Sequence, residues 1–195
     1  NRDELPDGGA SHYRACLEAI HARKPTVGLE FLCSDLDGNF EALSTLLDGI
    51  KLRVFAHNVE CVPRLDSVVR DHRASFEQSI DVLREAKRIR PDILTKSSIM
   101  VGIGETDEEV VEAMQRLREV DVDLLTIGQY LSPSPRHLAV DRFPAPEVFV
   151  KWDQVAREIG FKAVACGPLV RSSYRAGLLY EEAKGGAIAH TYGES

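Results

Sequence analysis

Short apolar segments alternate with longer amphipathic ones along most of this 195-residue chain, and this alternation constrains the fold more than any other feature. The apolar segments have the length of strands and are followed by turn-forming residues, at positions 27–33, 54–58, 98–102, 124–131 and 163–166. Helical patterns lie before and between them, at positions 9–23, 39–47, 75–90, 107–120 and 146–160. Repeated strand–helix units are typical of a parallel sheet covered by helices. The sequence therefore predicts an α/β fold, a partial (β/α) barrel whose first strand or strands are missing.

Two of the predicted helices carry clear signals at their ends. Thr106 stands before three acidic residues, which is typical of an N-cap followed by side chains that complement the positive end of the helix dipole. The preceding helix is predicted to end at Arg90, because Pro91 disfavours helical geometry in the residue before it. Apolar stripes predict that both helices pack against the sheet, through Ile80, Leu83, Ala86, Lys87, Ile89, Val110, Val111, Met114 and Leu117.

Charge and hydropathy narrow the kinds of partner. The net charge of -7 and the pI near 5.4 argue against nucleic-acid binding, which needs a basic face. The sequence has no apolar stretch approaching the roughly 18 to 20 residues that a membrane span needs. We therefore expect a protein or small-molecule partner, no nucleic acid and no membrane span.

The four cysteines, Cys16, Cys33, Cys61 and Cys166, are widely separated and form no C-x-x-C or C-x-x-x-C-x-x-C motif. Their spacing predicts neither a metal site nor a secreted disulfide framework, and indicates a reducing compartment. The chain begins at Asn1 without a signal or transit peptide. We expect it to be the middle of a gene product.

Candidate ligand-binding residues cluster near the predicted carboxyl ends of strands, where parallel α/β proteins place their sites. Asn58 and Glu60 would point to one side of an extended chain and could bind the vicinal hydroxyls of a ribose. Their neighbours His57 and Cys61 resemble metal ligands, but on a strand that ends in a loop we expect a structural histidine and a buried cysteine.

Two glycine pairs offer further candidates. Asp7 with Gly8 and Gly9 could approach a bound group and accept from an ammonium, or could simply form a helix-capping turn. The loop containing Gly102 and Gly104 could approach a cofactor, or could be a tight turn without a ligand. The acidic helix start that follows disfavours phosphate, so a nearly neutral or zwitterionic adenosyl group fits better. The segment 167–174 adds hydroxyls and one guanidinium, which suit an anion site or a capped loop.

These clusters, taken in order, resemble the lipoyl synthase family of radical S-adenosylmethionine (radical SAM) enzymes. The resemblance rests on NRDELPDGGA, FAHNVE, LTKSSIMVGIGETDEE, DLLTIGQYLSPSPRHL and GPLVRSSY, and runs to about Tyr174. It implies a radical SAM partial barrel over residues 1–177, including the RSSY segment, followed by a tail at 178–195. For S-adenosylmethionine it implies contacts at Asp7, Gly8, Gly9, Asn58, Glu60, Lys96, Gly102, Gly104, Glu105 and Gln129. Ser173 matches the serine that ligates an iron of the auxiliary cluster.

The same resemblance implies a reaction. Lipoyl synthases insert two sulfur atoms at C6 and C8 of a protein-bound octanoyl-lysine, using S-adenosylmethionine and two 4Fe-4S clusters. Side-chain acid–base catalysis cannot break an alkyl C–H bond, so the cofactor carries this step. The implied partners are octanoylated lipoyl carrier domains, namely the E2 subunits of 2-oxo acid dehydrogenases and the glycine cleavage H protein. The implied location is the bacterial cytoplasm, or alternatively a mitochondrion or plastid.

The chain departs from this family in its cysteines, because both clusters need cysteine motifs that are absent here. We therefore expect an inactive fragment of an ordinary lipoyl synthase. One alternative is a clusterless paralogue that binds S-adenosylmethionine or lipoyl carrier domains without catalysis. A second is an unrelated aldolase-like barrel with Lys96 as a Schiff-base lysine at a strand end. The residues encoded upstream of Asn1 would separate the fragment from the paralogue.

Overall fold

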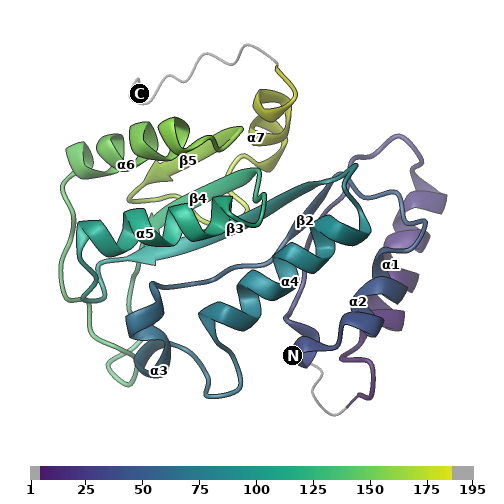
Figure 1. Ribbon diagram of the computed structural model, residues 1–195, viewed down its shortest axis with the longest axis horizontal. Helices are drawn as coiled ribbons and strands as arrows, with labels where there is room; N and C mark the ends of the chain where they lie inside the picture. Colours follow the sequence, from purple (N-terminus) through teal and green to yellow (C-terminus); the bar gives the residue numbers. More distant parts are fainter. Residues whose placement is uncertain (1–4, 186–195) are drawn as a thin grey trace.

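The computed structural model describes residues 5–185 and contains a five-stranded parallel sheet (Figure 1). The strands lie in chain order, and each pairs in parallel with the next. Their bounds are β1 (Glu30–Leu32), β2 (Val54–Ala56), β3 (Leu94–Val101), β4 (Leu124–Gln129) and β5 (Ala163–Gly167). The sheet does not close on itself, so the predicted α/β class and the partial barrel are confirmed.

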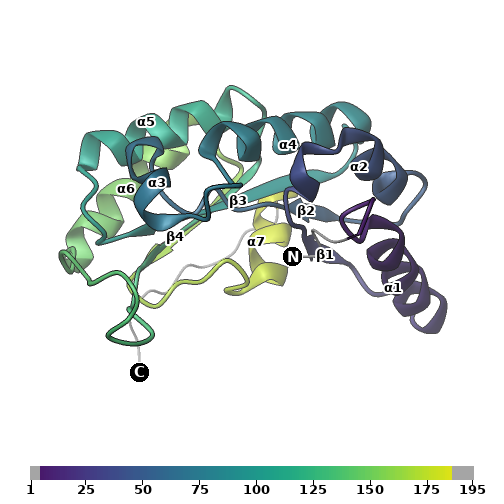
Figure 2. The same ribbon diagram turned by 90° about the horizontal axis from the view of Figure 1, so that it is seen from below.

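Helices cover the outer face of the curved sheet, and α7 lies against the opposite, concave face (Figure 2). The longer helices are α1 (Ala10–Arg23), α2 (Phe40–Leu47), α4 (Phe76–Ile89), α5 (Asp107–Arg118), α6 (Pro146–Ile159) and α7 (Ala176–Ala183). Shorter turns are η1 (Leu36–Gly38), η2 (Pro63–Leu65) and α3 (Asp66–Val69). The N-cap at Thr106 is confirmed, because its hydroxyl accepts from the Glu109 amide in a capping box.

Two layers of apolar side chains hold these elements together. On the outer face, Leu125 and Ile127 pack with Val110, Met114 and Leu117 of α5, as the stripe predicts, whereas Val111 lies at the edge of this layer and is only partly buried. On the concave face, Val54, Leu94 and Leu124 pack with Val170 and with Leu179 of α7. The alternation of side chains along each strand therefore sends successive residues to two different cores.

The structure corrects two boundaries. Strand β3 begins at Leu94, four residues before the predicted start, because residues 94–97 pair with β2 and with the start of β4 although their sequence is mostly polar. The expected domain boundary between 177 and 178 falls inside α7, whose Leu179 is buried against the sheet. The segment up to Ala183 is therefore packed with the barrel. The rest of the expected tail, 186–195, lies outside the described residues.

No helix within residues 5–185 is both long enough and apolar enough to span a bilayer.

Candidate functional site

A polar cavity of about 360 Å³ lies at the carboxyl ends of β1 and β2. The residues that follow these two strands form one wall, and the loop before α4 forms another. The lining residues are Tyr13, Leu32, Cys33, Ser34, Asp35, His57, Asn58, Glu60, Arg70 and Ala74. Two carboxylates and one guanidinium therefore share a single cavity.

Asn58 and Glu60 lie in this wall and are hydrogen-bonded to each other. The Asn58 Nδ2 donates to Glu60 Oε1 at 3.1 Å, so the predicted placement of both side chains on one side is confirmed. The Asn58 Oδ1 is buried and has no hydrogen-bond partner among the described residues. A buried polar oxygen without a partner costs about 1–3 kcal/mol, and a ligand hydroxyl would remove that cost.

The backbone at Glu60 is strained. Glu60 has a φ of +66°, in the left-handed region that non-glycine residues seldom occupy. Its backbone is fixed on both sides, because its N–H donates to the Ser98 carbonyl at 3.1 Å and its own carbonyl accepts from Met100 at 2.7 Å. Burial raises the pKa of the Glu60 carboxyl, and hydrogen bonding from Asn58 partly opposes this shift. Such strain of about 1–3 kcal/mol persists where surrounding contacts impose it, often at binding sites.

His57 and Cys61 are structural, as expected. The His57 ring contacts the Cys33 carbonyl through Nδ1 and the Ser79 hydroxyl through Nε2, each at 2.9 Å. Cys61 is fully buried beside Asp66, and burial raises the pKa of its thiol to about 12. Neither side chain is arranged to hold a metal ion.

Arg70 is, with Asp35, one of the charged cavity residues that the sequence did not reveal. It directly follows the short helix α3, away from any strand end, and its side chain is only 8% exposed. Its Nη1 donates to Ser79 Oγ at 2.9 Å, while Asp66 lies at 3.9 Å, beyond hydrogen-bond distance. The position of Arg70 depends on how the loop folds back over α4, which no short motif specifies.

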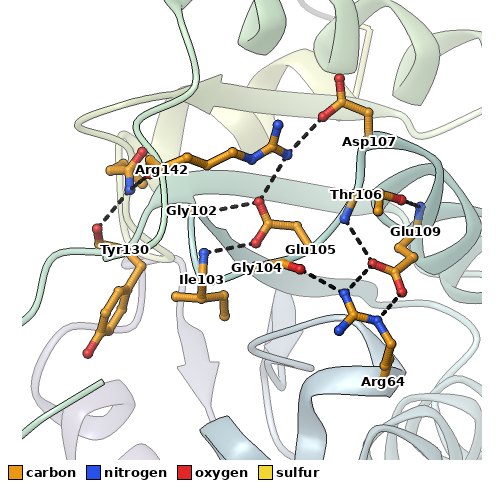
Figure 3. A network of polar contacts seen from close by, with 11 residues as sticks. Arg64, Gly102, Ile103, Gly104, Glu105, Thr106, Asp107, Glu109, Tyr130 and Arg142 are labelled. Atoms are coloured by element: carbon orange, nitrogen blue, oxygen red, sulfur yellow. Dashed lines mark hydrogen bonds and ion pairs between the residues drawn. The ribbon is translucent and has the colours of Figure 1, made fainter. Parts of the chain in front are cut away.

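The Gly102 loop is filled by its own acidic residue (Figure 3). The Glu105 side chain is buried and accepts from the Gly102 and Ile103 amides at 2.8 and 2.9 Å. The Gly102 position has no room for a side chain, because a Cβ there would lie 2.4 Å from the Arg142 carbonyl. From the sequence, we expected a cofactor to lie close to the Gly102 backbone. In the structure, the chain's own Arg142 carbonyl makes this close approach.

Two arginines fasten this loop (Figure 3). Arg142 contacts Glu105 at 3.2 Å and Asp107 at 2.8 Å. Arg64 binds both carboxylate oxygens of Glu109, at 2.6 and 2.9 Å, and also donates to the Gly104 carbonyl at 2.7 Å. The loop is thus held from both sides.

Gln129, at the end of β4, belongs to the same network. Its Nε2 donates to the Tyr130 and Arg142 carbonyls at 2.9 and 3.1 Å. Its amide group therefore ties the Arg142 end of the segment after β4 back to the end of that strand.

The Asp7 turn matches the helix-capping interpretation. The two Asp7 oxygens accept from the Gly9 and Ser11 amides, each at 2.9 Å, and hydrogen bonding to Ser11 and Gly9 lowers the pKa of Asp7 to about 2. Gly8 and Gly9 have φ of +59° and +89°. Gly8 also lines a second cavity of about 230 Å³, and Ser34 lines both cavities. The glycine turn therefore adjoins the Asn58 cavity.

Lys96 and Ser173 lie apart from this cavity wall. Lys96 is inside β3 rather than at a strand end, is 1% exposed, and its Nζ contacts Glu30 Oε1 at 2.7 Å. Its Nζ is held by Glu30 and lines neither cavity described above, so a carbonyl substrate has no route to it and the aldolase interpretation loses its basis. Ser173 is exposed in the turn after β5 and lines neither cavity described above.

The cysteines of this chain do not fit an iron–sulfur cluster. Cys33, Cys61 and Cys166 are buried, and burial raises the pKa of each thiol. Within residues 5–185, no three His, Cys, Asp or Glu side chains lie close enough together to hold a metal ion. We therefore derive no reaction step through a cluster.

Comparison with known proteins gives a consistent result. Residues 2–117 match the model of the radical SAM superfamily. The chain is 52% identical over 180 residues to a chloroplastic lipoyl synthase of Ricinus communis, covering 92% of this chain and 49% of that protein. It is 52% identical over 183 residues to the lipoyl synthase of Thermus thermophilus, covering 94% of this chain and 56% of that protein.

The chain thus spans about half the length of the curated relatives that it matches. The matched part carries the curved parallel sheet, the Asn58 cavity and the Gly102 loop. The chain belongs to the radical SAM superfamily and, within it, to the lipoyl synthase family that its motifs resemble.

Proposed function

We propose that this chain is the S-adenosylmethionine-binding part of a lipoyl synthase, and that the ligand binds at the carboxyl edge of the sheet. The observation that carries the proposal is the Asn58–Glu60 pair in the wall of the polar cavity. The pair presents an amide oxygen without a partner and a buried carboxylate. Two neighbouring ribose hydroxyls could donate to both groups, which would satisfy each of them.

The charges in the cavity also suit this ligand. S-adenosylmethionine carries a sulfonium, an ammonium and a carboxylate, so its net charge is positive. The cavity offers the carboxylates of Asp35 and Glu60 and the guanidinium of Arg70, so its net charge is negative. We assign the ligand carboxylate to Arg70, because a guanidinium is the group that best matches a carboxylate.

The other residues named from the sequence take supporting positions in this proposal. The Gly8–Gly9 turn would border the amino-acid end, since its cavity adjoins that of Asn58. The Gly102–Glu105 loop would border the adenine, with Glu105 and Gln129 shaping the loop instead of contacting the ligand. Lys96 would not contact the ligand and would support the site indirectly, through its ion pair with Glu30 in β1. Ser173 remains a candidate ligand of the auxiliary cluster only.

For the whole protein, we propose the reaction of its family, the insertion of two sulfur atoms into an octanoyl-lysine on lipoyl carrier domains. The two 4Fe-4S clusters of that reaction need cysteine ligands outside this set of 195 residues. We therefore propose that this polypeptide alone binds S-adenosylmethionine but makes no lipoyl product. Its relatives include chloroplastic and bacterial proteins, so a plastid or a bacterial cytoplasm is the proposed location.

Isothermal titration calorimetry of the chain with S-adenosylmethionine tests the proposal. We expect saturable binding that Asn58→Ala weakens about tenfold, since the hydrogen bond that the Asn58 oxygen accepts from the ligand is lost and one such bond contributes about 0.5–1.5 kcal/mol. Gln115→Ala, an exposed position on α5, is the control and should bind like the wild type. Failure of the wild type to bind, or equal affinity of the Asn58 variant, would overturn the proposal.

Iron and sulfide analysis tests the second part. After anaerobic reconstitution, the chain should contain essentially no iron, because its buried thiols are held in the protonated form. Iron in stoichiometric amount would contradict our interpretation of the cysteines.

A further inference from the structure

A chain of three hydrogen bonds runs from the backbone after β1 to the cavity guanidinium. The Cys33 carbonyl contacts His57 Nδ1 at 2.9 Å, and His57 Nε2 contacts Ser79 Oγ at 2.9 Å. Ser79 Oγ in turn contacts Arg70 Nη1 at 2.9 Å. His57 and Ser79 are both buried, with 5% and 0% exposure, so water does not compete for these bonds.

The direction of every bond in this relay follows from its two ends. A carbonyl only accepts, so His57 Nδ1 carries the proton and donates to Cys33. Burial lowers the pKa of His57, so the ring is neutral near pH 7 and its Nε2 accepts. The Ser79 hydroxyl must then donate to Nε2, which leaves its oxygen lone pairs for Arg70. The Cys33 carbonyl therefore only accepts and Arg70 only donates, while His57 and Ser79 each donate one bond and accept one.

The hydrogen-bond partner of Arg70 is a neutral hydroxyl and its ion pair with Asp66 is long, at 3.9 Å, which distinguishes it from a neighbouring arginine. Arg64 lies against both oxygens of Glu109, so its charge is neutralised within the protein. Arg70 instead donates to a hydroxyl, and Asp66 stands 3.9 Å away with its other oxygen bound to the Phe76 amide. The Arg70 guanidinium is thus fixed in place while much of its charge stays available to an anion.

We propose that His57 and Ser79 are positioning residues, which act through Arg70 to hold its guanidinium ready for the carboxylate of the bound amino-acid group. The proposal rests on the function proposed above, because it takes S-adenosylmethionine as the ligand. It assigns a functional reason to a histidine that the sequence identified only as structural. Without the relay, the long Arg70 side chain regains its rotamer freedom and can fold onto Asp66 or Glu60.

The test is a titration of the full chain with two ligands, S-adenosylmethionine and its decarboxylated form, which keeps the sulfonium and the amine. We expect Ser79→Ala to weaken S-adenosylmethionine binding about tenfold, the equivalent of about 1.4 kcal/mol, and to change binding of the decarboxylated ligand less than about twofold. In an Arg70→Gln background, Ser79→Ala should have little further effect, because residues that act through one another are not additive. Ser44→Ala, at an exposed position in α2, is the matched control.

The outcomes separate the two proposals. If wild-type chain binds S-adenosylmethionine but Ser79→Ala weakens both ligands equally, or weakens neither, the positioning role is wrong while the proposed function stands. If the wild type binds neither ligand, both are wrong. If Ser79→Ala does not fold, Ser79→Cys takes its place, since a thiol is similar in size and a weaker hydrogen-bonding group, and the same ligand comparison decides.

Discussion

The two edges of the sheet treat their buried acidic and polar groups in opposite ways. At the amino edge, Asp123 is almost fully buried, and its oxygens contact Lys87 at 2.6 Å, Lys162 at 2.7 Å and the Thr95 amide at 2.9 Å. At the carboxyl edge, Asn58 keeps an oxygen without a partner and Glu60 has a left-handed backbone. Asp123 is satisfied internally, whereas the Asn58 cavity leaves its polar groups incomplete, although Glu105 elsewhere on the carboxyl edge is satisfied by the chain itself.

This difference teaches where the molecule gains stability and where it gives stability up. A buried carboxylate with three partners stabilises the fold, and nothing about it is left for a ligand. The strained backbone of Glu60 and the unsatisfied oxygen of Asn58 each cost about 1–3 kcal/mol. The strain persists only because the neighbouring strand imposes this backbone geometry. The contrast predicts that substitution of Asp123 changes stability and that substitutions in the Asn58 cavity change binding.

The largest expected effect is at the amino edge. Asp123→Ala should lower the free energy of unfolding by about 3 kcal/mol, because it leaves a mostly buried Lys87 ammonium without its carboxylate. Urea unfolding measures this change. Affinity for S-adenosylmethionine should stay the same in the folded variant, and a parallel loss of affinity would break the contrast between the edges.

The same residue gives a pH dependence of known sign. Burial acts to raise the pKa of Asp123, but hydrogen bonds from Lys162, Lys87 and the Thr95 amide, together with the Lys87 charge, outweigh it, so the pKa is lowered in the folded protein. The contribution of Asp123 to the free energy of unfolding is therefore complete above the ordinary carboxyl pKa of 3.8. It is lost as the pH falls through the lower pKa of the folded state. Asp123→Asn should flatten this part of the stability profile, and an unchanged slope below pH 4 would contradict the assignment.

The second largest effect concerns the loop at the carboxyl edge. Glu105→Gln should lower the free energy of unfolding by about 2 kcal/mol, because one of two amide-bound oxygens becomes a donor facing another donor. The Glu105→Gln variant therefore tests whether this carboxylate at the carboxyl edge stabilises the fold. Glu108→Gln, at an exposed position in the first turn of the following helix α5, is the control for charge alone and should stay within about 0.5 kcal/mol.

The smallest effect has the opposite sign. Glu60→Gly should raise the free energy of unfolding by about 1 kcal/mol, since glycine adopts a φ of +66° without strain and no carboxylate remains to be buried. The same variant should bind S-adenosylmethionine more weakly. A variant that loses stability would show that the carboxyl edge is not strained in the way we describe.

Sequence patterns sufficed where local rules operate. The five strands, the helix ends near Arg23, Leu47 and Arg90, and the Thr106 cap all follow from periodicity, turn residues and capping chemistry. The common side of Asn58 and Glu60 follows from their two-residue spacing. These features depend on residues that are close in the chain.

The remaining features depend on contacts between distant residues. The start of β3 was hidden because Lys96 is a charged residue whose partner, Glu30, lies 66 positions away. Helix α7 was missed because its burial depends on the concave face of the sheet, and Arg70 because its anchor is on α4. The Gly102 loop looked open to a cofactor because the sequence does not show that Glu105 turns back to fill it.

The attachment of the segment after β4 has a consequence for the kinetics of ligand binding. Arg142 joins this segment to the Gly102 loop through Glu105, and the Asp141 amide adds a bond of 2.9 Å to the Gly102 carbonyl. Two loops that are fastened together lose their independent motion when the chain folds, before any ligand arrives. The entropy of ordering them is then absent from the binding step, so association should proceed without a slow closing phase of these two loops.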